Sequence, residues 1–116
     1  MNDAKTTVAE LIQLIERFIA ERQWERFHDP KNLSASIAIE AAELMEHFQW
    51  LRSDQLSEVT ADEVTMAAVR DELADIVAYT LSFARVMGID VSAALEDKMK
   101  KNALKYPADR YRGRFR

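Results

Sequence analysis

Only two glycines and two prolines interrupt this chain of 116 residues, and that scarcity constrains its fold more than any other feature. Glycine and proline are the residues that disfavour helices most strongly, so a chain with so few of them favours long helices. The residues are 48% hydrophobic and 31% charged, which is the balance of a globular protein. We therefore predict an all-α fold, a bundle of four to five helices, formed as one domain over residues 1–116.

Apolar periodicity and capping residues place four helices along the chain. The predicted helices cover residues 7–22, 32–51, 60–88 and 90–106. A loop over residues 24–31 separates the first two, because Pro30 disfavours a helical conformation at Asp29. The basic end of the chain, residues 110–116, is predicted to be a mobile tail.

Composition excludes several kinds of site and partner. The chain has no cysteine, so any metal must be held by oxygen or imidazole ligands. A formal charge of -4 argues against a nucleic acid as the main ligand, and the tail arginines are expected to be solvated or to contact another subunit. No apolar run approaches the roughly 20 residues of a membrane span, and the N-terminus lacks the apolar core of a signal peptide. We expect a cytoplasmic protein with no nucleic-acid or membrane partner.

Acidic residues occupy the apolar faces of two predicted helices. The apolar stripes consist of Leu33, Ile37, Leu44 and Leu51 in the second helix, and of Val69, Ile76, Phe83 and Met87 in the third. At about 100° per residue, Glu40 falls within the first stripe and Glu72 within the second. Glu43 and Asp75 lie on the flanks of these stripes. Both helices therefore carry a pair of acids spaced i, i+3 on the side expected to pack.

A carboxylate on a buried face is costly unless it is paired or binds a metal. Local partners are absent, since residues 32–51 and 71–84 contain no lysine or arginine. A single acidic pair is common on solvated helices, but two pairs on apolar stripes indicate a shared site, and all-oxygen ligation suits Mg²⁺ or Mn²⁺. A ferritin-like di-iron bundle would need Glu-x-x-His on two helices. His47 stands four residues after Glu43, and the third helix has no histidine.

At these residues the sequence resembles the all-α nucleotide pyrophosphohydrolases of the MazG-like superfamily. Their pattern is Glu-x-x-Glu followed on a later helix by Glu-x-x-Asp, which residues 40–43 (EAAE) and 72–75 (ELAD) fit. Further segments are similar to the dCTP pyrophosphatase branch of that superfamily. These segments are residues 21–28 (ERQWERFH), 30–33 (PKNL), 43–44 and 48–50 (EL and FQW), and 98–99, 102 and 106–107 (KM, N and YP). The resemblance covers roughly residues 10–107 and implies a MazG-like helical bundle.

The resemblance implies roles for individual residues. The implied Mg²⁺ ligands are Glu40, Glu43, Glu72 and Asp75; the implied nucleoside pocket contains Trp24, His28, Trp50 and Tyr79; and Lys98 and Asn102 would approach the phosphates. Helical spacing supports two of these assignments, because Tyr79 follows Asp75 by one turn and Trp50 follows Glu43 by two turns. Ile15 stands where the dCTP pyrophosphatases carry a histidine in the first helix, which changes one wall of the implied pocket.

The implied reaction converts a deoxynucleoside triphosphate, dCTP or a modified dCTP, and water into the monophosphate and pyrophosphate, as nucleotide-pool house-cleaning. Either Glu43 or Glu46 could serve as the general base. Lys98 would offset charge on the phosphate oxygens. The resemblance also implies a homo-oligomer, a tetramer arranged as a pair of dimers. The main alternative is a non-catalytic helical interaction module, whose acidic pairs bind a basic partner or a structural cation.

Overall fold

The computed structural model describes residues 1–114, and all regular elements of the described chain are helices, with no strand. Four long helices carry the fold: α1 (Val8–Glu21), α2 (Pro30–Glu46), α4 (Glu63–Val86) and α5 (Val91–Lys105). Short elements connect or follow them: the 3-10 turns η1 (Glu25–Phe27) and η2 (Ser53–Gln55), and the helices α3 (Ser57–Ala61) and α6 (Ala108–Tyr111). The predicted all-α class is confirmed.

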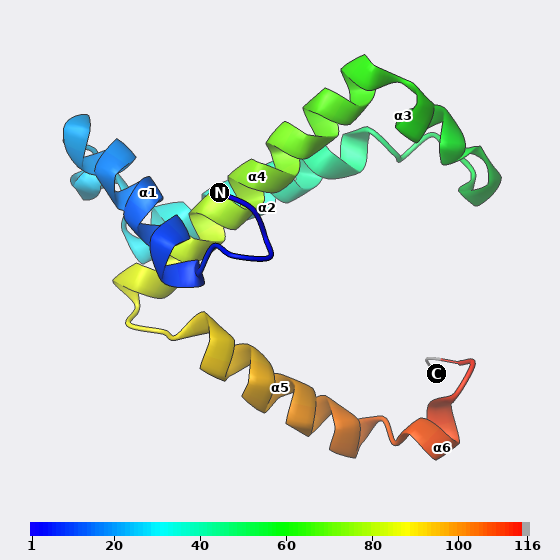
Figure 1. The fold of residues 1–116 in the computed structure, drawn as a ribbon. Helices are drawn as coiled ribbons and strands as arrows, with labels where there is room; N and C mark the ends of the chain where they lie inside the picture. Colours follow the sequence, from blue (N-terminus) through cyan, green and yellow to red (C-terminus); the bar gives the residue numbers. More distant parts are fainter. Residues whose placement is uncertain (115–116) are drawn as a thin grey trace.

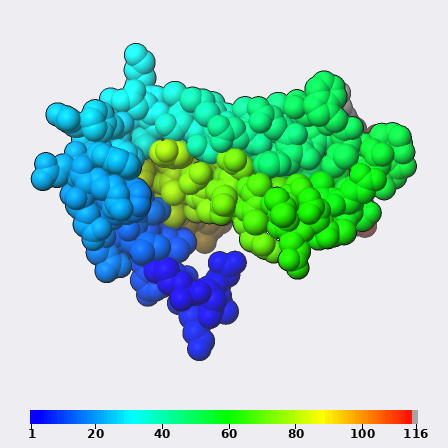
Figure 2. All heavy atoms as spheres, turned by 90° about the horizontal axis from the view of Figure 1, so that it is seen from above, coloured from blue at the N-terminus to red at the C-terminus, as the bar shows by residue number. Residues whose placement is uncertain are grey.

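The α2–α4 pair forms the centre of the molecule. Figure 1 shows the two helices side by side, running in opposite directions and joined at one end through η2 and α3. Figure 2 shows the same pair in contact along its length, with α1 at the end where α2 begins. Leu33 of α2 is 1% exposed, and Leu81 and Ala84 of α4 are also buried. This packing brings together the inner faces of α2 and α4. These are the faces that carry the acids.

The first half of the chain follows the predicted pattern, with one shifted boundary. Thr7 caps α1, since its side chain accepts a hydrogen bond from the backbone N–H of Glu10 at 3.1 Å. α2 begins at Pro30, two residues earlier than predicted, because Asp29 adopts an extended backbone and accepts the N–H of Asn32 at 2.8 Å. Proline suits the first turn of a helix, where its missing N–H has no partner to lose.

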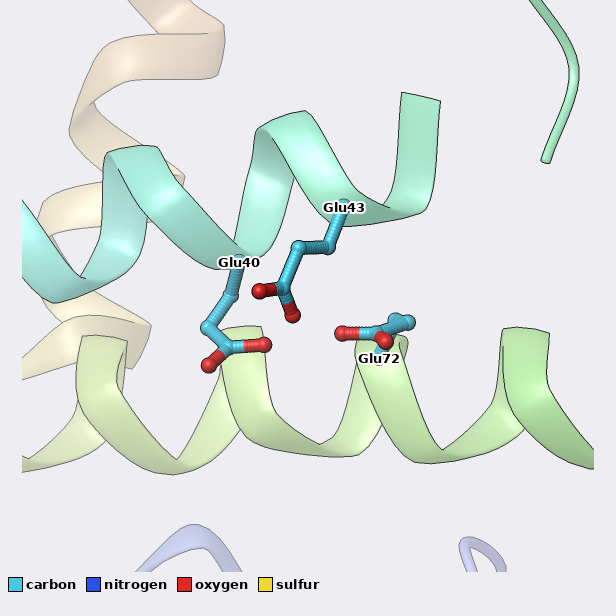
Figure 3. Close-up of side chains that lie close together, drawn as sticks. All are labelled: Glu40, Glu43 and Glu72. Carbon is cyan, nitrogen blue, oxygen red and sulfur yellow. The ribbon is translucent and has the colours of Figure 1, made fainter. Parts of the chain in front are cut away.

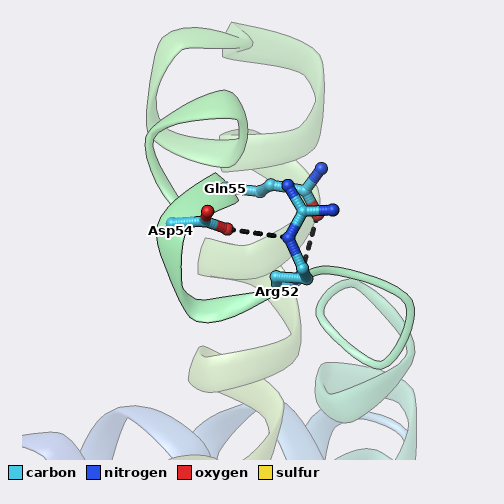
Figure 4. Close-up of polar contacts among 3 residues, drawn as sticks. All are labelled: Arg52, Asp54 and Gln55. Carbon is cyan, nitrogen blue, oxygen red and sulfur yellow. Dashed lines mark hydrogen bonds and ion pairs between the residues drawn. The ribbon is translucent and has the colours of Figure 1, made fainter.

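The connection between α2 and α4 differs more from the sequence prediction. α2 ends at Glu46 and not at Leu51, and residues 47–50 form turns. The Arg52 side chain donates to Asp54 Oδ1 at 3.1 Å, and the Arg52 N–H donates to Gln55 Oε1 at 2.9 Å, which fixes η2 (Figure 4). Thr60 does not cap the long helix, because it lies inside α3 and α4 starts at Glu63.

The end of α4 and the whole of α5 agree with their predicted caps. Gly88 has φ +68°, a left-handed conformation that glycine adopts without a Cβ clash, and the Ile89 N–H donates to Ala84 O at 2.8 Å. Asp90 caps α5 by accepting the N–H of Ala93 at 2.9 Å. Helix α6 reaches into the segment predicted to be a mobile tail, whose last two residues, 115–116, lie outside the described residues.

The described chain has an open shape, because α5 leaves the α2–α4 pair instead of packing along it (Figure 1). Its radius of gyration is 17.3 Å, whereas a compact chain of this length would have about 13 Å. In residues 1–114, no single helix is long and apolar enough to cross a membrane; α4 and α5 reach that length and hydropathy only together, as a pair bent by 98°.

Candidate metal centre

Three carboxylates meet between α2 and α4. Glu40 and Glu43 project from α2 and Glu72 projects from α4 toward them (Figure 3). One oxygen from each residue lies within 4.8 Å of the other two, and all three residues are half-buried. The arrangement follows from the sequence, since residues spaced i, i+3 share one side of a helix and the inner faces of α2 and α4 pack together.

The cluster has no positive charge of its own. Within the described part of the chain, none of the ion pairs involves Glu40, Glu43 or Glu72. Glu40 Oε2 and Glu72 Oε2 are buried and accept no hydrogen bond from residues 1–114. A buried carboxylate oxygen without a donor is costly, so the cluster lacks the partner that its geometry requires.

Crowding of the acids also shifts their protonation. The pKa of Glu40 is raised from 4.5 to about 7, chiefly because protonated Glu40 can share its proton with the facing carboxylate of Glu72. Burial adds to this rise in pKa, and so do the hydrogen-bond capacity and charge of Glu43 and the charge of Asp75. The site therefore holds a proton or attracts a cation near neutral pH.

A divalent cation fits the residues present. The donor set consists of carboxylate oxygens alone, which hard divalent cations prefer. The two buried oxygens without donors, Glu40 Oε2 and Glu72 Oε2, would gain a partner from such an ion. Asp75 lies one turn after Glu72 but is exposed and outside the group of three. We expected four acids around one cavity, and the structure brings three of them together, with Asp75 beside them.

An aromatic cleft of about 180 Å³ adjoins the cluster. Its walls come from α1, α4 and the loop around η1, and are formed by Ile15, Phe18, Ile19, Trp24, His28, Asp75, Ala78, Tyr79 and Ser82. The rings of His28 and Tyr79 are stacked with their centroids 6.5 Å apart. Burial raises the pKa of the Tyr79 hydroxyl, as do the charges of Glu40, Asp75 and Glu43. Asp75 lines this cleft and none of the three clustered glutamates does, so the cleft lies beside the cluster, on the side of Asp75.

The loop between α1 and α2 carries two of the aromatic walls. Gln23 has φ +54°, a conformation that costs a non-glycine residue energy and turns the chain sharply after α1. His28 Nδ1 lies 2.9 Å from Trp24 O, a hydrogen bond that closes the loop on itself. The Trp24 ring contacts Phe18 edge-on with centroids 5.8 Å apart. The predicted loop is therefore ordered, and it holds Trp24 and His28 beside Tyr79.

Comparison with known proteins identifies the family. The model of the MazG-like family matches residues 35–114, a range that contains all three carboxylates of the cluster. The chain belongs to the MazG-like family. This finding confirms the resemblance noted in the sequence.

Individual relatives of this MazG-like chain carry names that concern nucleotides or pyrophosphate. It is 34% identical to dCTP pyrophosphatase 1 of Bos taurus over 95% of this chain and 65% of that protein. It is equally similar to dCTP pyrophosphatase 1 of Homo sapiens, over 88% of this chain and 60% of that protein. The chain thus spans less than two thirds of the length of these relatives. A pyrophosphatase from Archaeoglobus fulgidus has a similar structure, with 39% identity, a TM-score of 0.81, and coverage of 92% of this chain and 98% of that one.

Other residues implied by the MazG-like resemblance lie away from the cluster. Trp50 is 87% exposed, because α2 ends before it and the helical spacing from Glu43 no longer applies. Lys98 and Asn102 are on α5, which does not pack against α2 or α4. Glu46 is the last residue of α2, and it is exposed and not part of the group of three.

Sequence reasoning missed one polar residue of the MazG-like site. Ser82 lines the aromatic cleft and is 6% exposed. The signal was present in its spacing, since Ser82 follows Tyr79 by three residues and Asp75 by seven and so lies on the same face of α4. Spacing alone does not assign it to a site, because a small uncharged side chain on an apolar helix face does not by itself require a ligand.

Proposed function

We propose that this chain hydrolyses a nucleoside triphosphate, dCTP or a modified dCTP, to the monophosphate and pyrophosphate in a Mg²⁺-dependent reaction. The observation that carries this proposal is the cluster of half-buried Glu40, Glu43 and Glu72, which has no cation of its own and lies beside an aromatic cleft. The names of the relatives, dCTP pyrophosphatase 1 and pyrophosphatase, support the same reaction class. The proposed role is the removal of unwanted nucleotides from the pool.

The metal in this proposal is Mg²⁺, with Mn²⁺ as a substitute. Glu40, Glu43 and Glu72 would hold it together with Asp75, whose charge already influences Glu40. When bound, such an ion would neutralise triphosphate charge and make a water more acidic. The unpartnered oxygens of Glu40 and Glu72 support this assignment, because an ion would satisfy both.

The chain's own residues would position the nucleotide and accept a proton. Trp24, His28 and Tyr79 would hold the nucleoside between aromatic faces. The attacking water needs a base that the metal does not saturate, and the two candidates are Glu43 in the cluster and Glu46 at the end of α2. The pH–rate profile of Glu46→Gln separates them, because Glu43→Gln would also remove a proposed metal ligand: loss of the acidic limb identifies Glu46, and an unchanged profile identifies Glu43.

Oligomerisation would give a role to three residues that lie away from the cluster, Lys98, Asn102 and Trp50. In one chain, α5 departs from the α2–α4 pair, so Lys98 and Asn102 do not converge with the carboxylates. In a homotetramer built as a pair of dimers, these residues would approach the phosphates bound by another copy. The 87% exposure of Trp50 supports the same idea, because an indole is unfavourable in water and favourable at an interface or against a ligand.

The test is pyrophosphate release from a panel of canonical and modified deoxynucleoside triphosphates, with Mg²⁺ or with EDTA. We expect release with Mg²⁺ alone, highest for a cytosine nucleotide. A thermal shift assay should show stabilisation by Mg²⁺ that increases when a non-hydrolysable dCTP analogue is added, because bound ligands stabilise the folded state. No release from any nucleotide, together with equal melting temperatures in EDTA, Mg²⁺ and Mg²⁺ plus analogue, would favour the non-catalytic interaction module.

A further inference from the structure

Ser82 is a buried residue of α4 whose hydroxyl group faces the aromatic cleft. The residue is 6% exposed, yet its Oγ takes part in no hydrogen bond with residues 1–114. Thr80, two residues earlier on α4, behaves differently: its hydroxyl donates to Ile76 O at 2.6 Å, which is how a helical hydroxyl usually satisfies itself. Among residues 1–114, the buried side-chain oxygens without a partner are Glu40 Oε2 and Glu72 Oε2, so Ser82 Oγ is not sealed off and can be reached by a ligand in the cleft.

Ser82 stands where two cavities meet. The aromatic cleft beside Asp75 measures about 180 Å³, and a second cavity of about 190 Å³ lies further along α1 and α4. Four residues line both cavities: Ile15, Ile19, His28 and Ser82. The other shared walls are two isoleucines and a histidine, so Ser82 and His28 are the polar side chains common to the two cavities.

The register of α4 relates Ser82 to the metal site. Glu72, Asp75, Tyr79 and Ser82 recur at intervals of three or four residues and therefore follow one face of the helix. At a rise of about 1.5 Å per residue, Ser82 lies roughly 10 Å beyond Asp75 along α4. A nucleotide whose phosphates bind at the carboxylates and whose sugar lies near Tyr79 would place its base beside Ser82.

We propose that Ser82 determines base specificity by hydrogen bonding to the C4 substituent of a pyrimidine. This inference rests on the proposed function, because it takes the direction of the nucleotide from it. A pyrimidine is joined to the sugar through N1, so the C4 group across the ring is the part that reaches furthest from the phosphates. The Ser82 hydroxyl can accept from the amino group of cytosine or donate to the oxo group of uracil or thymine.

The surroundings make this single hydrogen bond selective. Ile15 and Ile19 offer no hydrogen bond, and His28 already uses Nδ1 against Trp24 O, so a base that lacks a polar C4 group covers the Ser82 hydroxyl without giving it a partner. Sites built around one hydrogen bond reject analogues that lack it, because the unpaired group loses its contact with water. The substrate class assigned to the site is therefore a pyrimidine nucleotide with a polar C4 group.

The test pairs a change in the protein with a change in the base. The substrates are dCTP and the deoxynucleoside triphosphate of pyrimidin-2-one, which lacks only the C4 amino group. Wild-type enzyme should prefer dCTP in kcat/KM by about 10-fold, the effect of one neutral hydrogen bond. Ser82→Ala should abolish that preference by slowing dCTP alone, and Ser82→Thr, which keeps the hydroxyl, should retain it. Thr80→Ala removes a hydroxyl outside the cleft and should leave the preference intact.

Two outcomes would overturn the inference. The first is a Ser82→Ala variant that keeps the full preference for dCTP, and the second is one that slows both substrates equally, as a packing defect would. If the wild type releases no pyrophosphate from any nucleotide, the proposed function fails separately. Calorimetric binding of dCMP and its pyrimidin-2-one counterpart then decides the matter: tighter dCMP binding that Ser82→Ala removes supports the role of Ser82, and equal affinities exclude it.

Discussion

Glu40 is the residue of the acidic cluster that is most affected by repulsion from the neighbouring carboxylates. It faces Glu72 across the α2–α4 contact and lies one turn from Glu43 on its own helix. Its Oε2 has no hydrogen-bond partner in the described chain, and its pKa is raised to about 7 by these neighbours. Such a residue lowers the stability of the metal-free fold, and the same charge favours the binding of a cation.

The first prediction follows from that double role. Glu40→Gln and Glu72→Gln each remove a charge but keep the shape, so each should lower pyrophosphate release by about 100-fold or more, since even residues behind metal ligands contribute about 10–100-fold. In EDTA, the same variants should melt at a higher temperature than the wild type, because carboxylate repulsion is relieved. Asp71→Asn is the matched control, as Asp71 is an exposed acid on the same helix and outside the cluster. Wild-type turnover in both cluster variants would exclude the metal site.

The second prediction concerns pH in the absence of metal. Glu40 has a pKa of about 7 in the folded chain and 4.5 as its ordinary value, so between these values the folded state holds a proton that the unfolded state has released. Protonation of Glu40 therefore adds a free energy of the order of 1–3 kcal/mol to the stability of the folded state. This contribution is fully present below pH 4.5 and is lost as the pH rises through 7. Urea unfolding in EDTA between pH 5 and 8 measures this loss. Glu40→Gln should flatten the pH dependence, and an unchanged slope in that variant would contradict the assignment to Glu40.

At the scale of the elements, the start of α2 couples local capping to the aromatic cleft. Asp29 accepts the Asn32 N–H at 2.8 Å and the Asn32 side-chain amide at 3.1 Å. The residue immediately before it, His28, stacks against Tyr79 in the cleft wall. A helix cap thus also holds the end of the loop that shapes the proposed nucleoside site.

The third prediction tests that coupling. Asp29→Ala should reduce the free energy of unfolding by about 1 kcal/mol, which is the usual contribution of a helix N-cap. It should also weaken nucleotide binding more than Mg²⁺ binding, because the loop is loosened while the carboxylates stay in place. Asp29→Ser keeps an acceptor at the cap and should restore most of both quantities. Chemical denaturation and calorimetric titration measure the two effects, and equal weakening of Mg²⁺ and nucleotide would show a general loss of fold instead.

Helix and cap patterns predicted much of this architecture, and their failures have physical causes. The caps at Thr7 and Asp90 are local interactions, so sequence alone predicted them. The end of α2 could not be predicted, because residues 47–51 remain apolar enough to continue the stripe, and Trp50 was placed by a helix that stops at Glu46. The direction of α5 was equally inaccessible, since an apolar stripe shows that a face is covered without showing what covers it.

The proximity of the acids was predictable for a different reason. Glu40, Glu43 and Glu72 lie on faces that must pack, and two packed helices bring their inner faces together whatever their exact ends. Asp75, on the flank of its stripe, depends on the rotation of α4 about its axis, and it lies in the adjoining cleft. Ser82 needed the shape of the cavities, which spacing alone does not give.

At the scale of the whole molecule, the chain exposes more surface than a self-contained domain does. Its accessible surface is 9397 Å², whereas a folded monomer of 13.4 kDa has about 6,500 Å². Large apolar side chains contribute to the excess, and on α5 they include Leu95, Met99 and Leu104, with Leu104 83% exposed. An exposed apolar helix is typical of a surface that another subunit covers.

The fourth prediction is that the chain forms a homo-oligomer through this surface. Light scattering after size exclusion should give a mass near four times 13.4 kDa, with dimers at low concentration if the tetramer is a pair of dimers. Leu104→Glu places a charge in the proposed interface and should shift the mass toward smaller species, while Leu104→Met keeps an apolar side chain and should not. Because Lys98 and Asn102 lie on the same helix, the dissociated variant should lose turnover but keep Mg²⁺ binding, which depends on α2 and α4 alone. A wild type that is monomeric at every concentration and fully active would contradict both the assembly and the proposed role of α5 in the active site.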